Sequence, residues 1–135
     1  MTSPHFLGKI SLRAIVVRDG KVLISRDVND VDTWEIPGGR LHEGESLEEG
    51  LKREIQEELG VDANIGALVY SEQFHQTRDG SLHLLLTYEV TLTDPTAEFR
   101  FDPHEVAEVK WISKDDLKNY KLYENCLNAL NTYWR

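Results

Sequence analysis

Cysteine is nearly absent from this sequence, which has one, Cys126, among 135 residues. A single cysteine cannot form an internal disulfide, so we expect a reducing, cytoplasmic compartment. Long apolar runs are also missing. Neither the first ten residues, MTSPHFLGKI, nor any later stretch reaches the length of a signal-peptide core or a membrane span. We therefore expect no membrane partner.

Basic residues are scarce: 15 Lys and Arg stand against 24 Asp and Glu, for a net charge of −9. Such a charge repels nucleic-acid backbones and anionic membranes, so no nucleic-acid partner is expected. It still permits a small anionic substrate that a divalent cation bridges to the protein. The length and the 40% hydrophobic content predict one soluble globular domain, residues 1–135. No sequence feature decides between a monomer and a homodimer.

Strands are predicted where alternating or β-branched residues lie between turn signals. Asp19-Gly20 and Asp79-Gly80 are typical hairpin turns. Residues 27–33 are polar and predict a loop, and Pro37-Gly38-Gly39 predicts a sharp turn. The predicted strands cover residues 9–17, 21–25, 65–75, 82–92 and 106–112.

Helices are predicted in three places. The first begins after Ser46, which with Glu49 forms a capping-box pattern, and ends at Gly60. A short helix follows Ser113, and a last helix covers about residues 123–133, with Cys126 on its apolar face. The order of strands, helix, strands and helix predicts an α/β protein with a mixed sheet between helices.

The first helix lies in an acidic stretch, GRLHEGESLEEGLKREIQEELGV, residues 39–61, which holds seven glutamates. At about 100° per residue, one apolar stripe must face the core, and Glu54 and Glu57 lie on its flank together with Gly50. Glu58 falls at the edge of the stripe, near the end of the helix. The stripe consists of Leu47, Leu51, Ile55 and Leu59.

This flank is costly to the fold. Like charges three or four residues apart each cost about 0.2–0.5 kcal/mol, and a glycine inside a helix costs about 1 kcal/mol relative to alanine. A hard divalent cation would offset the repulsion between the carboxylates, and room for a phosphate would explain Gly50. Arg53 can pair with Glu57 or reach Glu45. The alternative is an acidic helix that is simply solvated.

These positions resemble the Nudix box, G-x5-E-x7-R-E-U-x-E-E-x-G-U, in which U is a bulky aliphatic residue. Every defined position of the box is matched at the right spacing. The matching residues are Gly39, Glu45, Arg53, Glu54, Ile55, Glu57, Glu58, Gly60 and Val61. The resemblance implies the Nudix fold, an α/β/α sandwich with a central mixed sheet.

The resemblance also implies hydrolysis of a nucleoside diphosphate linked to a group X, with Mg²⁺ or Mn²⁺ as cofactor. Water would attack a phosphorus atom with metal assistance. By position, Glu54, Glu57 and Glu58 are metal ligands, with the Gly38 carbonyl as a further ligand. Arg53 and Glu45 would orient the loop and the helix. The general base would be Glu54, or one of Glu105 and Glu108 outside the box.

Other residues are candidates for substrate contact, each with a structural alternative. Trp34 would stack on a base or cover the sheet. His75 and His83, on two arms of a hairpin, would face a substrate cleft or solvent. His42 would touch a phosphate. Asn125 is placed like the asparagine with which MutT-like members read an oxidised guanine, but it also suits a helix start.

The range of possible substrate classes is narrowed by the absence of motifs that other members of the family carry. The residues beyond the box, Phe74 to Gly80, contain neither the proline of ADP-ribose hydrolases nor the tyrosine of dinucleoside-polyphosphate hydrolases. This favours the small MutT-like group, acting on a nucleoside triphosphate or a nucleotide sugar. The alternatives are those two other hydrolase types, an isomerase-like or decapping relative, and a catalytically silent Nudix ligand-binding or regulatory module.

Overall fold

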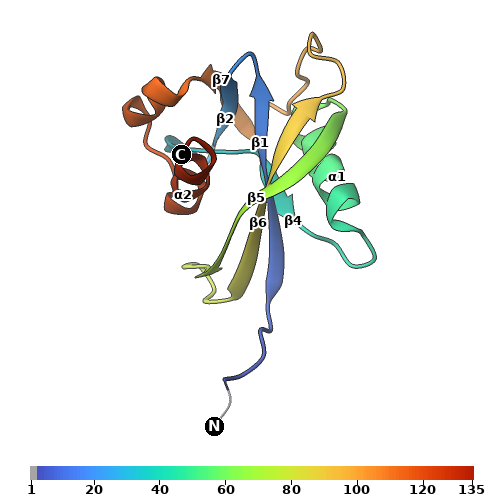
Figure 1. The fold of residues 1–135 in the computed structure, drawn as a ribbon, viewed down its shortest axis with the longest axis vertical. Coiled ribbons are helices and arrows are strands. Elements are labelled where there is room, and N and C mark those ends of the chain that lie inside the picture. The colour runs from blue at the N-terminus through green and yellow to red at the C-terminus, as the bar shows by residue number, and fades with distance from the viewer. Residues whose placement is uncertain (1–2) are drawn as a thin grey trace.

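A mixed seven-stranded sheet forms the centre of the molecule in the computed structural model, which describes residues 3–135. The main strand order is β3-β2-β1-β6-β5, with β4 paired to β1 and β7 paired to β2. Helices α1 and α2 lie on opposite sides of the sheet, which confirms the predicted α/β/α sandwich (Figure 1). The strands are β1 (Lys9–Arg18), β2 (Lys21–Asp27), β3 (Asp30–Glu35), β4 (Gly38–Arg40), β5 (Ala63–His75), β6 (Leu82–Leu92) and β7 (Val106–Ile112).

The central pair of strands, β1 and β6, is parallel, from Lys9 opposite His83 to Val17 opposite Thr91. Parallel strands need a long crossover connection, and here that connection contains α1 (Leu47–Leu59). The other strand pairs are antiparallel. Strand β1 is covered on both faces, which explains its apolar run Ala14 to Val17.

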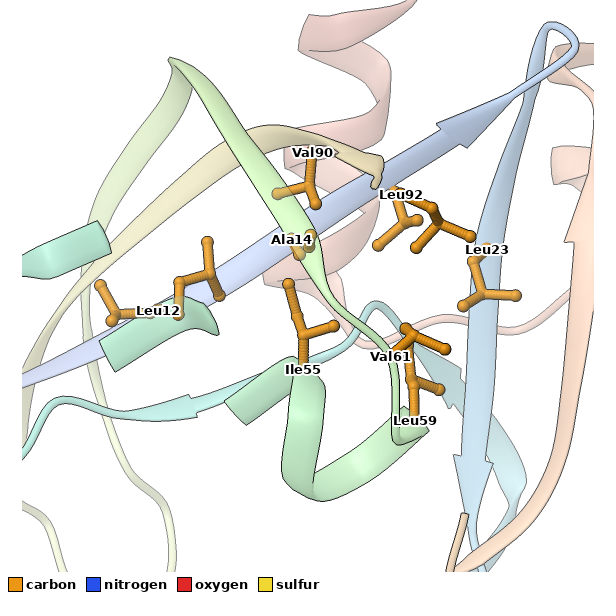
Figure 2. Close-up of a cluster of buried hydrophobic side chains, with 11 residues drawn as sticks. Leu12, Ala14, Leu23, Ile55, Leu59, Val61, Val90 and Leu92 are labelled. Atoms are coloured by element: carbon orange, nitrogen blue, oxygen red, sulfur yellow. The ribbon is translucent and has the colours of Figure 1, made fainter. Parts of the chain in front are cut away.

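Two apolar cores lie on the two faces of the sheet. On one face, Leu12 and Ala14 of β1 pack with Ile55 and Leu59 of α1 and with Val90 of β6 (Figure 2). The core on the other face contains Ile15, Ile24, Ile36, Cys126 and Leu130. Because side chains alternate along a strand, β1 supplies both cores. The core position predicted for Cys126 is confirmed, with the residue fully buried.

The predicted loop at residues 27–33 is wrong, because β3 begins at Asp30 and pairs with β2. A tight turn joins the two strands, in which the Asn29 N–H donates to the Asp27 carboxylate at 2.7 Å. Strand β3 lies at the end of the main strand order, and its polar residues hide it from pattern analysis. The predicted turn at Pro37-Gly38-Gly39 includes the start of the short strand β4.

The first helix, α1, has the predicted bounds and caps. The Ser46 hydroxyl accepts a hydrogen bond from the Glu49 N–H at 3.1 Å, and Gly60 ends the helix at φ 67°. The predicted stripe is too long, since Leu47 is 37% exposed. The buried residues of the helix begin only after it, at Gly50 and Leu51. The remaining helices are the 3₁₀ helix η1 (Lys114–Asn119) and α2 (Glu124–Tyr133).

Candidate active site

The Arg53 guanidinium organises the acidic flank of α1. Its Nε and Nη2 donate to the two carboxylate oxygens of Glu45 at 2.6 and 3.0 Å. Its Nη1 donates to Glu54 at 2.8 Å and to both oxygens of Glu57 at 3.3 Å. Both pairings considered for Arg53 from the sequence are therefore present at once. One guanidinium joins the loop before the helix to two carboxylates on the helix.

The loop that leads into α1 is fixed through Glu45. Besides its two bonds from Arg53, this carboxylate accepts the His42 backbone N–H at 2.8 Å. The hydrogen bonds from Arg53 lower the pKa of Glu45 to about 2. Arg53 also donates to the Arg40 carbonyl at 3.0 Å, which ties β4 to the helix. This network holds Glu45 ionised and the entrance to the helix in one geometry.

Strand β4 lies directly against the acidic flank, and its glycines make that approach feasible. A Cβ at Gly39 would overlap the Glu54 carboxylate, so no other residue fits there without moving Glu54. The Gly38 N–H donates to the Glu58 carboxylate at 3.3 Å. The two glycines thus place backbone beside two of the box carboxylates. The Gly38 carbonyl remains a predicted ligand.

Glu58 is the box carboxylate with the most perturbed acidity. Burial raises its pKa to about 8, against the opposing effects of Arg13 and the Gly38 N–H, and the charges of Glu35 and Glu54 add to the increase. Desolvation and nearby negative charge both disfavour a carboxylate anion. An added cation would reverse this, so the chemistry of the site fits a metal ion.

In the structure of residues 3–135, the acidic side chains of the box do not surround a common position for a metal ion. Within residues 3–135, no group of three His, Cys, Asp or Glu side chains is arranged to hold one. Glu54 and Glu57 share Arg53, whereas Glu58 lies beside Gly38. The donor types nevertheless suit Mg²⁺, which prefers carboxylate and carbonyl oxygens and keeps some of its waters.

Gly50 does not make room for a phosphate, and that expectation is corrected. The residue is buried, and a Cβ there would lie 2.7 Å from Leu41 Cδ1, 3.1 Å from Leu12 Cδ1 and 3.3 Å from the Glu45 carboxylate. The helix contacts its own entry loop and β1 at this point. Gly50 is therefore needed for packing.

Glu35 lines two cavities, one of which also includes the box residue Glu58. The first, of about 270 Å³, is lined by residues that include Glu58, Glu35 and Glu105. Glu105 is therefore brought to the box, and Glu108 is held by an ion pair of 2.7 Å with Arg26. The second cavity, of about 310 Å³, is lined by Arg13, Glu35, Phe74, Gln76, Thr77, Arg78, Tyr123 and Asn125. Asn125 thus lies beside the site, although it is far from the box in sequence.

Trp34 and His83 are buried, so the structure favours the alternative in which Trp34 covers the sheet, and His83 faces neither a cleft nor solvent. Trp34 is buried in the core against Tyr120, with their ring centroids 5.5 Å apart. His83 is 1% exposed, and its two ring nitrogens contact the hydroxyls of Ser11 and Ser81, both at 2.9 Å. Their strands turn these side chains inward, which a sequence pattern does not reveal.

The remaining histidine candidates are exposed. His75 lies at the end of β5 and His42 in the loop before α1. The site also contains two residues that sequence reasoning missed, Arg13 and Glu35. Arg13 Nη1 donates to the Ile36 carbonyl at 2.9 Å and lies 3.8 Å from the Glu35 carboxylate. For Arg13 the available signal was a charged residue next to the apolar run of its strand, whereas Glu35 ends a polar strand and gave no such signal.

Comparison with known proteins agrees with this architecture. A family model described as "NUDIX domain" matches residues 9–130. The chain is 32% identical over 112 residues to a CTP pyrophosphohydrolase of Escherichia coli K12, covering 81% of this chain and 78% of the relative. It is 35% identical over 114 residues to a MutT-like protein of Streptomyces ambofaciens, covering 79% and 71%.

A solved structure of a UDP-X diphosphatase has the same fold. It superposes with a TM-score of 0.80 at 24% sequence identity, and the match covers 98% of this chain but only 64% of that longer chain. This likeness extends the agreement to nearly all of the present chain. At this level of identity it concerns the fold alone.

The fold and the acidic flank define an α/β/α hydrolase of the pyrophosphohydrolase class. The chain belongs to the Nudix hydrolase family and resembles its MutT-like members. Enzymes of this family act on small nucleotide substrates and generally use divalent metals. None of the helices formed by residues 3–135 is both long and apolar enough to cross a membrane.

Proposed function

We propose that this protein is a Mg²⁺-dependent pyrophosphohydrolase, able to use Mn²⁺ as well, that cleaves a pyrophosphate bond of a nucleoside triphosphate. The observation that carries the proposal is the crowding of Glu54, Glu57 and Glu58 on one flank of α1 beside β4. The raised pKa of Glu58 supports a cation there. The similarity to a CTP pyrophosphohydrolase favours a triphosphate over a nucleotide sugar.

Glu54, Glu57, Glu58 and the Gly38 carbonyl are the proposed metal ligands. When bound, the ion would supply neutralisation of phosphate charge and a lower pKa for the attacking water. Arg53 would keep Glu54 and Glu57 oriented from its anchor on Glu45.

Glu105 is the proposed general base. It lines the first cavity together with Glu58, and it is exposed, so its carboxylate can accept a proton from water entering the cavity. Glu54 is less suited, because Arg53 donates to it at 2.8 Å, so one of its carboxylate oxygens is already engaged. Glu108 is paired with Arg26 in the same way.

The second cavity is the proposed site of the nucleoside. Asn125 lines it, and the Asn125 Oδ1 atom is buried without a hydrogen-bond partner. A buried acceptor left unpaired costs about 1–3 kcal/mol, and a substrate N–H would satisfy it. The phosphates would then extend into the first cavity, toward Glu58. His42 and His75, both exposed, remain secondary candidates for contact with substrate.

A panel of nucleoside triphosphates tests the proposal, with release of pyrophosphate or phosphate as the readout. We expect hydrolysis that requires Mg²⁺ and a loss of at least about 100-fold in kcat for Glu57→Gln, since that change removes one charged ligand. Glu57 has a 58% exposed side chain, so folding should be little affected.

The matched control is Glu48→Gln. Glu48 lies on the same helix, pairs only with Lys52 at 3.1 Å among the ion pairs of the described residues, and has a 61% exposed side chain. This variant should keep the activity of the unmodified protein. Hydrolysis that survives EDTA, or that is undiminished in Glu57→Gln, would refute the proposed function.

A further inference from the structure

Strand β5 ends the main strand order of the sheet, and among the described residues it pairs only with β6. Its other side is therefore an open edge. A strand at the edge of a sheet presents a row of backbone N–H and C=O groups without partners. With 13 residues, β5 is also the longest of the described strands, so this row is long. The edge of β5 is a surface to which a further strand can be added.

The first half of β5 lacks the charged residues that usually protect an open edge. Residues 63–71 contain no charged side chain. Gly66, Ala67 and Leu68 are all exposed, and Leu68, at 52%, is the most exposed large hydrophobic residue on any of the described strands. Natural proteins often place charges or proline at such edges to prevent association between sheets. An edge without them favours association.

The strand at the opposite end of the sheet, β3, is protected in two ways. Three of its six residues are acidic. Its outer edge is also covered, because the Trp34 N–H donates to the Lys121 carbonyl at 2.8 Å and the Trp34 carbonyl accepts the Tyr123 N–H at 3.1 Å. The same sheet therefore has one end closed to a further strand and the other end open.

Two bulges in β5 limit how a further strand can pair with it. The register with β6 shifts between Ile65 and Leu68 and again between Leu68 and Tyr70. A bulge bends its strand and is one of the devices that weaken pairing at an edge. We therefore expect a short contact centred on Leu68, and an association that is reversible.

We propose that the open edge of β5 binds the same edge of a second copy of this protein, antiparallel and around a two-fold axis at Leu68. Such a contact uses one patch on both copies, so it closes as a dimer. Antiparallel pairing about Leu68 places Glu72 of each copy opposite Asn64 of the other. It places Asp62 opposite Phe74. Like charges directly opposite one another destabilise a sheet, and this register has none.

The net charge of −9 determines where two copies can meet. Two molecules of this charge repel one another, and the repulsion is weakest where neither surface carries charge. Residues 63–71 provide such a surface, and burial of Leu68 from both copies adds hydrophobic stabilisation. A partner of opposite charge would bind the acidic surfaces of the molecule instead. The inference does not depend on the proposed function, because no step of it involves a nucleotide.

Sedimentation velocity from about 1 µM to about 1 mM protein, a range that spans moderate and weak affinities, tests the inference. We expect a monomer–dimer equilibrium, with more dimer at higher salt, because salt screens the repulsion between the acidic copies. Leu68→Lys should raise the dimer Kd at least about tenfold, since it removes the apolar contact and sets two like charges at the axis. The matched control is Val31→Lys, which adds the same charge to a 45% exposed valine of β3 and should leave the Kd unchanged.

Amide hydrogen exchange at high and low protein concentration locates the contact. The amides of residues 64–71 should exchange more slowly at high concentration in the unmodified protein, but not in Leu68→Lys. Equal melting temperatures would show that Leu68→Lys remains folded. The inference is overturned by a protein that is monomeric over the whole range, by a dimer that Leu68→Lys does not weaken, or by protection confined to other strands.

Discussion

At the scale of single residues, the polar side chains of this protein differ in what burial does to them. Glu45 is held ionised by Arg53, Glu58 is pushed toward its neutral form, and His83 is enclosed between two hydroxyls. Residue type alone therefore does not reveal which histidine or glutamate is available for chemistry. Burial and hydrogen-bond partners decide which side chain is available, and their effect can be measured as a pH dependence of protein stability.

The buried His83 is expected to make the folded protein less stable at acidic pH. Burial lowers the pKa of His83 below its usual 6.5, with Arg40 and Lys9 contributing in the same direction. The unfolded chain takes up this proton at higher pH than the folded chain, so stability present above pH 6.5 is lost as the pH falls through the folded pKa. We expect His83→Gln to reduce the decrease in unfolding free energy between pH 7 and 5.

Urea denaturation at several pH values measures the effect of His83→Gln. The matched control is His75→Gln, an exposed histidine at the end of the neighbouring strand β5. That change should leave the pH dependence of stability unchanged. The same slope in the unmodified protein and in His83→Gln would show that another group controls the acid response.

At the scale of elements, the decisive contact is the one between β4 and α1. Gly39 brings the strand so close to Glu54 that a Cβ would overlap the carboxylate. We expect Gly39→Ala to displace Glu54 from Arg53 and to lower Mn²⁺ affinity at least about tenfold, a cost typical of disturbed ligand positioning. Mn²⁺ titration followed by electron paramagnetic resonance measures this affinity.

The stability of Gly39→Ala separates a local effect from unfolding. Because a side chain can move where a backbone cannot, we expect a loss below about 2 kcal/mol in unfolding free energy. Gln56→Ala, on the exposed face of the same helix, is the control and should alter neither quantity. Unchanged Mn²⁺ affinity in Gly39→Ala would mean that Glu54 can move without loss to the site.

The elements show how far the sequence leads. The bounds and caps of α1 and the pairing of Arg53 with Glu45 were predictable, since helix periodicity and loop length are local properties. The burial of Trp34 and His83 was not, because it depends on which elements cover each face of the sheet. Gly50 was misread for the same reason: its neighbour Leu41 packs back from the loop.

The convergence of Glu35 and Asn125 on one cavity was likewise beyond sequence reasoning. The sequence points to Asn125 only through a family resemblance and gives no signal for Glu35. Their strand and helix are separated by most of the chain, and backbone hydrogen bonds of Trp34 with Lys121 and Tyr123, just before α2, bring them together. Residues that line a cavity outside a sequence motif depend on such tertiary placement.

At the scale of the whole molecule, folding and cation binding are coupled through Glu58. Its folded pKa of about 8 lies above the usual value of 4.5. The stability that comes from the protonated form is complete below pH 4.5 and is lost as the pH rises through 8. The metal-free protein should therefore lose unfolding free energy between pH 4.5 and about 8, by a few kcal/mol at most, since one pH unit of pKa difference corresponds to about 1.4 kcal/mol.

Mg²⁺ should oppose that loss, given the proposed role of Glu58 as a ligand. The ion binds the deprotonated carboxylate of the folded protein, and saturating a site a hundredfold above its Kd adds about 2.7 kcal/mol. Melting temperatures measured with and without saturating Mg²⁺ should thus differ more as the pH rises. Glu58→Gln should abolish both the decline and the divergence, whereas Glu48→Gln should preserve them. A Mg²⁺ effect independent of pH in the unmodified protein would place the ion away from Glu58, because binding there must release the proton that burial retains.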